Sequence, residues 1–285
     1  MWNDCIKKSP NKARPYYNLG EAYANSEMAD EAIPLFLKSL DIDSSNAAVH
    51  HNLAVILAKK GKRDEAIVHY QKALEFNPGS VESHIGLGVQ RLKQKNFPEA
   101  INHYRKALQL QPENAKAHVN LGDALAKQGQ TKQAIKHLYR AVQINPDNAQ
   151  AHNNLGGQLL SQGNFDDALV HFNRALAINP DLAEAHNNLG IIMIRQGRLD
   201  AAVSHFQDAV RLDPDFTQAK NNLAQALAIS GSKNSEIAGI QKELDSRPDD
   251  PVLHFKLGNL YLGQRELKQA VIEFEKSVAL RPDFI

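Results

Sequence analysis

The sequence contains a single cysteine, Cys5, among 285 residues. An internal disulfide needs two cysteines, as does any metal site built from several of them, so both are excluded. No stretch approaches the roughly 20 apolar residues of a membrane span, and the first residues lack the apolar core of a secretory signal. The compartment stays unknown, and we expect a soluble segment that is either cytoplasmic or the solvent-exposed tail of a membrane protein.

The chain also lacks an excess of charge of either sign, because 33 basic residues face 32 acidic ones. A nucleic-acid or anionic-membrane surface would show a basic bias, so neither partner is expected. Apolar residues make up 42% of the chain, which is typical of a folded protein and not of a disordered one. No phosphate loop, metal motif or nucleophile–base pairing is present, so we predict neither an enzyme nor a cofactor.

The sequence does contain a repeat of 34 residues. With Ala13 as position 1, every unit has leucine at position 7, Gly or Ala at position 8 and a large apolar residue at position 24. Position 20 is alanine in all units except the one with Glu236, and position 32 is proline in all except the one with Ser44. Eight units follow without insertion or deletion: 13–46, 47–80, 81–114, 115–148, 149–182, 183–216, 217–250 and 251–284.

Apolar residues within a unit recur at two sets of helical spacings, positions 3 to 14 and positions 20 to 30. A break at positions 15–18 often carries glycine, as at Gly61 and Gly231, which fits a helix C-terminus. Proline at position 32 ends the second helix. Each unit is therefore predicted to be a helix, a tight turn and a second helix.

This pattern resembles the tetratricopeptide repeat (TPR) family, as in AHNNLGGQLLSQGNFDDALVHFNRALAINPD at residues 151–181. The resemblance covers nearly the whole chain. It implies an all-α fold, a right-handed superhelical solenoid of antiparallel helix pairs (an α-α superhelix) with a concave inner groove, in which the repeats form one continuous array. Residues 1–12, with Trp2 at position 24 and Cys5 at position 27, are predicted to be the second helix of an incomplete repeat, and Ile285 would open a ninth unit. The chain is thus expected to be part of a longer array.

All twelve histidines fall on three repeat positions. Six lie at position 4 and five at position 23, which are margins of the packed faces, and His51 lies at position 5. Equivalent positions of stacked helices lie about 10 Å apart, so a row with one histidine per unit cannot converge on one metal ion. We predict packing or hydrogen-bonding roles and no metal site, and a pH-sensitive stack is an open alternative.

Position 6 is asparagine in six units and faces the edge of the groove. An amide offers donors and acceptors to the backbone of an extended peptide, and the row is similar to the inner asparagine row of the O-GlcNAc transferase superhelix. The alternative is a purely structural role between neighbouring helices. The predicted peptide-binding asparagines are Asn18, Asn52, Asn120, Asn154, Asn188 and Asn222.

Position 13 carries a basic stripe through the middle units, formed by Lys59, Lys93, Lys127 and Arg195. The stripe favours an acidic or C-terminal carboxylate group on the ligand. The alternative is a set of solvated side chains that the helix dipole favours at helix C-termini. Position 5 carries no basic residue in any unit, so the carboxylate clamp of chaperone-binding members is not expected.

The seventh unit is irregular. Glu236 and Glu243 occupy positions where the family has small residues, and Gly239 lies inside the second helix. We expect a locally loosened seam between units six and eight, and no acid–base pair.

The leading function is therefore a non-catalytic scaffold that binds an extended peptide segment of a partner protein in the groove. The first alternative is an assembly module that self-associates end to end through exposed helix faces. The second is a substrate-recruiting region of a larger enzyme. It is suggested by a short likeness of residues 2–20 to the junction that precedes the repeat tails of bacterial membrane glycosyltransferase-like proteins.

Overall fold

The computed structural model describes residues 6, 9–26 and 28–281, and every regular element in these ranges is an α-helix. Trp2 and Cys5 of the predicted incomplete repeat, and Ile285 of the predicted ninth unit, lie outside the described residues. The helices are α2 (Ala13–Ala24), α3 (Ala29–Ile42), α4 (Ala47–Lys59), α5 (Arg63–Phe76), α6 (Val81–Lys93), α7 (Phe97–Leu110), α8 (Ala115–Lys127), α9 (Thr131–Ile144), α10 (Ala149–Ser161), α11 (Phe165–Ile178), α12 (Ala183–Arg195), α13 (Leu199–Leu212), α14 (Thr217–Ser246), α15 (Pro251–Gly263) and α16 (Leu267–Leu280).

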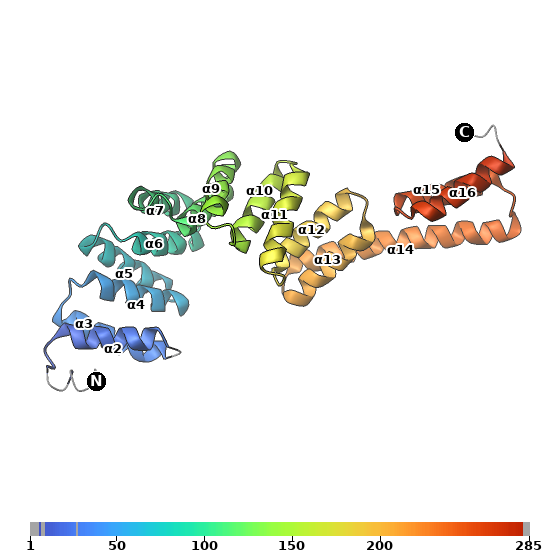
Figure 1. Ribbon diagram of the computed structural model, residues 1–285. Coiled ribbons are helices and arrows are strands. Elements are labelled where there is room, and N and C mark those ends of the chain that lie inside the picture. The colour runs from blue at the N-terminus through green and yellow to red at the C-terminus, as the bar shows by residue number, and fades with distance from the viewer. Residues whose placement is uncertain (1–5, 7–8, 27, 282–285) are drawn as a thin grey trace. The chain divides into compact units, whose positions relative to one another are not determined.

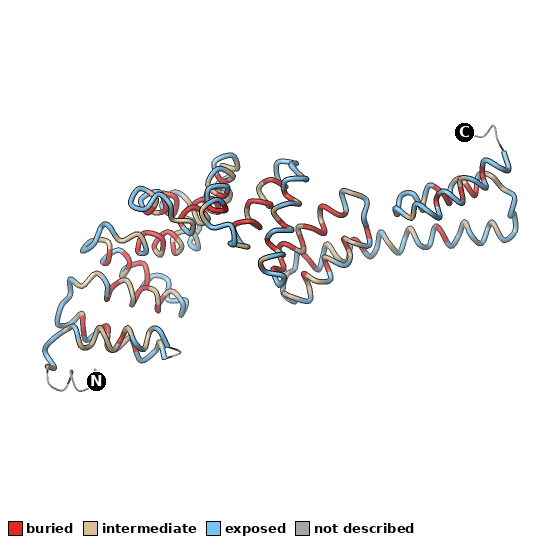
Figure 2. Tube along the Cα trace, in the orientation of Figure 1, coloured by how far each residue is buried: buried red, intermediate tan, exposed pale blue. Residues whose placement is uncertain are grey.

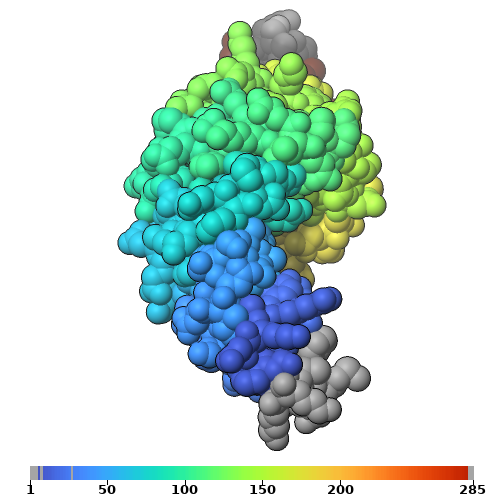
Figure 3. All heavy atoms as spheres, turned by 90° about the vertical axis from the view of Figure 1, so that its left-hand side faces the viewer, coloured from blue at the N-terminus to red at the C-terminus, as the bar shows by residue number. Residues whose placement is uncertain are grey.

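The chain divides into two compact units, Met1–Pro146 and Asp147–Ile285, which are described separately. In the first unit, helices pair into antiparallel hairpins from α2–α3 to α8–α9, and each hairpin packs on the next (Figure 1). Figure 3 shows this order as successive blue to green layers of atoms. In the second unit, α10–α11, α12–α13 and α15–α16 form the same hairpins. We call the first helix of a hairpin the A helix and the second the B helix. That the repeats run as one array past residue 146 stays a prediction.

Two local signals set the ends of the A helices. Position 34 is the N-cap: the Asn114 side chain accepts a hydrogen bond from the Ala117 amide at 2.9 Å, and Asn148 does the same for Ala151. Position 15 follows the last helical turn and has a left-handed backbone, with φ of 82° at Gly129 and 61° at Lys95. Glycine adopts this conformation without a steric cost, which explains why four of the six such turns contain it.

In the hairpins with glycine at position 8 of the A helix, the core contains a close contact between that glycine and position 24 of the B helix. A Cβ atom on Gly156 would lie only 2.8 Å from the Phe172 ring, and one on Gly190 would lie 2.5 Å from Phe206. Both rings are 2% exposed or less. The buried residues follow these paired faces in Figure 2, so close helix approach and ring insertion together form the core.

The seventh unit departs from the predicted helix–turn–helix. The break expected at Gly231 is absent, because α14 runs without interruption through 30 residues from Thr217 to Ser246. Its N-terminal half packs on α13 as an A helix would, and α15 packs against α14 as it would against a B helix. Only Ala219, Ala226 and Ile237 are buried along it (Figure 2).

The two glutamates explain why this unit does not form a hairpin. In the other seven units, position 20 is an alanine that is at most 1% exposed, and position 27 is an equally small residue wherever it is buried, as at Ala175 and Ser277. A hairpin in the seventh unit would place Glu236 and Glu243 in these two slots, where an unpaired carboxylate costs several kcal/mol. In the continuous helix both glutamates are exposed. The loosened seam expected here is thus a fused helix.

We expect the Glu236→Ala/Glu243→Ala variant to close α14 into a hairpin at Gly231, because both packing slots then become available. Spin labels at Gln218→Cys and Ser246→Cys, with Cys5 replaced by serine, report this change. Their backbones lie roughly 42 Å apart along a continuous helix and about 10 Å apart across a hairpin. The control Lys242→Ala/Asp245→Ala removes two exposed charges and should keep the long distance. A long distance in the double-alanine variant would contradict this explanation.

Candidate functional site

A cavity of about 420 Å³ opens between the A helices α4 and α6 in the first unit. Its apolar floor is formed by Val55 and Ala58 of α4 and by Ile85 and Val89 of α6. Three lysines, one glutamate and the Tyr70 ring border it. The lining residues are His51, Val55, Ala58, Lys59, Tyr70, Glu82, Ile85, Gly86, Val89, Gln90, Lys93, Asn114 and Lys116. The cavity therefore lies on the face on which the sequence placed the groove.

The Tyr70 ring reaches beyond its own repeat. Position 8 of α4 is Ala54 rather than glycine, and the Tyr70 ring lies close to position 6 of the next A helix. There, a Cβ atom on Gly86 would lie 2.5 Å from the ring and 2.8 Å from the hydroxyl oxygen. Gly86 occupies position 6, which is asparagine in most units, so its departure from the row has a steric cause. The Tyr70 hydroxyl borders the cavity as a result.

The four predicted basic residues lie where expected, exposed at the C-terminal ends of their A helices, but their surroundings differ. Lys59 and Lys93 both line the α4–α6 cavity, and neither has an ion-pair partner among the described residues. The Lys127 ammonium lies 2.6 Å from the Asp123 carboxylate, and the Arg195 guanidinium lies 4.9 Å from the centre of the Phe165 ring. Of the four, only Lys59 and Lys93 therefore line the same cavity, with no ion pair among the described residues to neutralise their charge.

The predicted asparagine row is half-buried at all six positions. Two members connect neighbouring A helices: Asn188 donates to Asn153 at 3.4 Å, and Asn222 donates to Asn187 at 2.8 Å. In each case position 6 reaches back to position 5 of the preceding repeat. Asn188 and Asn222 thus each use one N–H group to connect neighbouring repeats. This is the structural role that was the alternative to peptide binding. The second N–H group and the carbonyl oxygen of these amides stay available to a ligand.

The other members show what happens when position 5 changes. Asn52 lies close enough to the Tyr17 hydroxyl to oppose the rise that burial causes in its pKa, and Asn154 accepts a hydrogen bond from Gln150 at 2.8 Å. For Asn120, position 5 of the preceding repeat is Ile85, whose side chain offers no hydrogen-bond acceptor. The Asn120 amide nitrogen is buried without a partner among the described residues. The row is therefore chemically uneven, and Asn120 is its least satisfied member.

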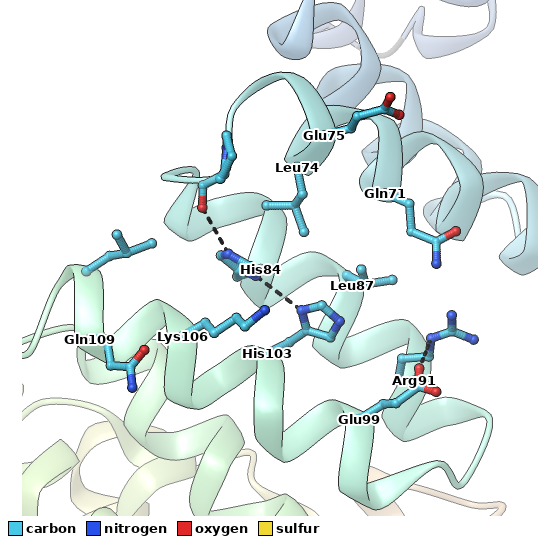
Figure 4. Close-up of a pocket in the computed structure, with 12 residues that line it drawn as sticks. Gln71, Leu74, Glu75, His84, Leu87, Arg91, Glu99, His103, Lys106 and Gln109 are labelled. Carbon is cyan, nitrogen blue, oxygen red and sulfur yellow. Dashed lines mark hydrogen bonds and ion pairs between the residues drawn. The ribbon is translucent and has the colours of Figure 1, made fainter.

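The histidines form pairs that sequence reasoning missed. Position 4 of an A helix meets position 23 of its own B helix, so His84 Nδ1 and His103 Nδ1 lie 3.1 Å apart (Figure 4). The same contact occurs at four further pairs, with distances of 2.9 to 3.2 Å: His50–His69, His118–His137, His152–His171 and His186–His205. His254 instead meets Glu273 at 2.5 Å. The constant separation of 19 residues was the signal that could have revealed these pairs.

The bonding partners fix the tautomers. His84 Nε2 lies 3.1 Å from the Pro78 carbonyl oxygen, which can only accept, so Nε2 carries the proton and Nδ1 is an acceptor. His103 must then donate through its own Nδ1–H. The pairs of His84, His118 and His186 thus join two helices of one repeat to the proline near the end of the preceding repeat, and His50 contacts the Ser44 carbonyl oxygen in the same way. Among the described residues, no three His, Cys, Asp or Glu side chains converge as a metal-binding group.

Burial lowers the pKa of both histidines in three of these pairs, His50–His69, His84–His103 and His118–His137, which favours their neutral forms. Desolvation lowers the pKa of His103 to about 4, and the neighbouring His84, Lys106 and Arg91 act in the same direction, while Glu99 opposes it. Desolvation likewise lowers the pKa of His137 to about 4. A cavity of about 550 Å³ covers the His84–His103 pair on the side of the B helices (Figure 4). Each pair is therefore a hydrogen bond between the A and B helices of one repeat, and protonation of its acceptor nitrogen at low pH would break it.

Family models described as tetratricopeptide repeat match residues 13–46, 47–80, 91–157, 147–215, 188–251 and 252–284. No curated protein sequence matches the chain. No helix in the described residues is long and apolar enough to cross a membrane.

Several solved structures are similar. YrrB, described as a TPR protein with an unusual peptide-binding site, is 27% identical with a TM-score of 0.53, and the match covers 65% of this chain and 96% of YrrB. MamA is 28% identical with a TM-score of 0.51, and the match covers 57% of this chain and 95% of MamA. PilF of Pseudomonas aeruginosa, at 21% identity and a TM-score of 0.66 over 75% of this chain and 97% of its own, shares the fold. The chain therefore belongs to the tetratricopeptide repeat family.

Proposed function

We propose that this protein is a non-catalytic scaffold that binds an extended segment of a partner protein along the face of its A helices. The family and its similar structures support a protein-interaction scaffold in general. The observation that carries the finer proposal is the α4–α6 cavity, whose apolar floor and unpaired lysines lie on the predicted groove face. Pockets of this kind, apolar with a few convergent polar groups, are typical of ligand sites.

The asparagine row supplies the second part of the proposal. A peptide lying across the A helices would meet an amide in six of the eight repeats, and these amides would pair with its backbone irrespective of its side chains. Asn120 supports this role, because its amide nitrogen has no partner among the described residues. An unpaired buried donor costs about 1–3 kcal/mol, which a peptide carbonyl could recover after a small rotation of the side chain.

The Asn120→Ala/Asn154→Ala/Asn188→Ala variant tests the row. We expect peptides selected from a random 12-residue display library on the unaltered protein to bind this variant at least about tenfold more weakly, because backbone hydrogen bonds are lost. Asn153→Ala is the matched control, since it removes the acceptor of the Asn188 bond but leaves every row amide in place. Selected peptides that bind the triple variant with unchanged affinity would rule out the row as the gripping element.

A further inference from the structure

The second unit contains a counterpart of the α4–α6 cavity, four repeats further along the chain. It lies between α12 and the N-terminal half of α14 and has nearly the same volume, about 400 Å³. The lining residues are Ile191, Ile194, Arg195, Phe206, Asn222, Gln225, Ala226 and Ile229. These are positions 9, 12, 13 and 24 of one repeat and positions 6, 9, 10 and 13 of the next, and all eight positions also line the first cavity.

The chemistry of the two cavities differs at the positions that matter for a ligand. Lys93 of the first cavity corresponds to Ile229 of the second, and the Tyr70 hydroxyl has no counterpart on Phe206. Lys59 corresponds to Arg195, but that guanidinium lies over the Phe165 ring. Ala58 corresponds to Ile194, which with Ile229 is more than a third exposed. One pocket geometry therefore occurs twice, once bordered by cations and once by aliphatic side chains.

The first cavity is suited to an anion. Lys59, Lys93 and Lys116 extend from three successive A helices, and Glu82 is the only acidic residue in the lining. Burial raises the pKa of Tyr70 to about 12, so its hydroxyl keeps its proton and can donate a hydrogen bond. A carboxylate placed over the apolar floor would meet cations and a neutral donor in a partly desolvated site, where charge–charge attraction is stronger than in water.

The second cavity is suited to an apolar side chain. Exposed isoleucines such as Ile194 and Ile229 gain roughly 25 cal/mol for each Å² of apolar surface that a ligand covers. A carboxylate there would lose its hydration without a second cation, because the lining contains Arg195 alone. The α4–α6 cavity therefore favours an anionic side chain over an apolar one, and the α12–α14 cavity favours the reverse.

Resting on the proposed function, we infer that the partner segment carries two anchors: an acidic side chain, aspartate or glutamate, for the α4–α6 cavity and an aliphatic or aromatic side chain for the α12–α14 cavity. The asparagine row binds backbone without selecting side chains, and the two cavities supply the sequence specificity. The order of the anchors along the partner follows the direction in which it lies across the A helices.

Reciprocal variants test this inference. Random 12-residue display libraries are selected separately on the unaltered protein, on Lys59→Ala/Lys93→Ile, and on Ile229→Lys. We expect enrichment of Asp or Glu on the unaltered protein to fall at least about tenfold on the first variant while apolar enrichment persists. On Ile229→Lys, the apolar enrichment should fall and the acidic enrichment should persist. Thermal melts check that each variant folds, which we expect because all three substituted side chains are exposed.

A synthetic pair of peptides gives a second measurement. The Glu-to-Gln form of a selected peptide should bind the unaltered protein about tenfold more weakly at low salt, with the difference shrinking at high salt because exposed charges are screened. The same pair should bind Lys59→Ala/Lys93→Ile equally well. Selected motifs without acidic residues, or acidic enrichment that survives this variant, would overturn the inference while leaving the scaffold in place. Failure to select any peptide would instead overturn the proposed function itself.

Discussion

Gly156→Ala is expected to destabilise the protein by up to about 2 kcal/mol, although alanine is the better helix former. The new methyl group would lie 2.8–3.0 Å from three atoms of the Phe172 ring, which is fully buried and cannot withdraw into solvent. Overpacking of this kind typically costs about 1–3 kcal/mol, and the gain in helix propensity of about 1 kcal/mol offsets only part of it. Thermal and urea unfolding of the variant measure the difference.

The adjacent residue provides the control. Gly157 lies in the same helix turn, and a Cβ atom there would meet nothing within 4 Å. Gly157→Ala should therefore stabilise the protein by about 0.5–1 kcal/mol through the propensity term alone. If the two variants changed stability in the same direction, the ring contact would not be what requires glycine at position 8.

The chain itself suggests how the Gly156 defect could be repaired. Where position 8 is Ala54, the ring of Tyr70 lies against position 6 of the next repeat, and that residue is Gly86. For Phe172 the corresponding position is Asn188. Asn188→Gly should therefore reduce the cost of Gly156→Ala, so that the double variant is more stable than the sum of the single changes predicts. Additive changes in the free energy of unfolding would show that the Phe172 ring does not shift toward position 6 of the next repeat, where the Tyr70 ring lies in its own repeat pair.

Acidification from pH 7 to pH 4.5 is expected to lower the melting temperature strongly through the histidine pairs. The folded-state pKa of His103 and of His137 is about 4, against 6.5 for an unperturbed histidine. On acidification, the unfolded chain therefore takes up protons first. This contribution to stability is fully present above pH 6.5, declines as the pH falls toward 4, and is gone below that value.

The first hairpin supplies a matched variant, because it carries Tyr16 and Leu35 at positions 4 and 23. Replacing His84 and His118 with tyrosine, and His103 and His137 with leucine, removes the two most shifted groups while keeping a native pairing. With about 1–2 kcal/mol for each half-buried group, the drop between pH 7 and 4.5 should be roughly 5–10 °C smaller than in the unaltered protein. Carboxylates titrate in both proteins, so the difference isolates the histidines. Parallel melting curves would contradict this role.

The sequence predicted the helix pairs well because local signals agree at every level. Leucine at position 7, glycine at position 15 and proline at position 32 each favour the same helix–turn–helix, and the structure confirms it in every repeat except the seventh. There the periodic pattern continues, including Gly231, but two glutamates occupy buried slots. The spacing of apolar residues carries no information on the free-energy cost of burying these two charges, so it does not predict the fused helix.

The candidate site was predictable in part. Repeat position gave the direction of Lys59 and Lys93, because a helical wheel converts sequence spacing into a face. The cavity between them is bordered by the Tyr70 ring, which lies against Gly86 of the next repeat, and helical spacing does not reveal that contact. The histidine pairs likewise join two helices whose mutual orientation the spacing along one helix does not define. The sequence pattern thus predicted the face on which a residue lies but not the contacts that depend on how the helices pack against one another.

The fused helix α14 also sets how far cooperative unfolding spreads. Hairpins that contact only their neighbours behave as a chain of nearest-neighbour couplings, and each link normally includes the packing of an A helix on its own B helix. In α14 that link is replaced by a stretch of exposed helix through Gly231 and Ser232, residues that favour helix weakly. Local opening of α15 and α16 therefore need not involve α10–α13, and the C-terminal hairpin forms a separate, less protected unit of the native state.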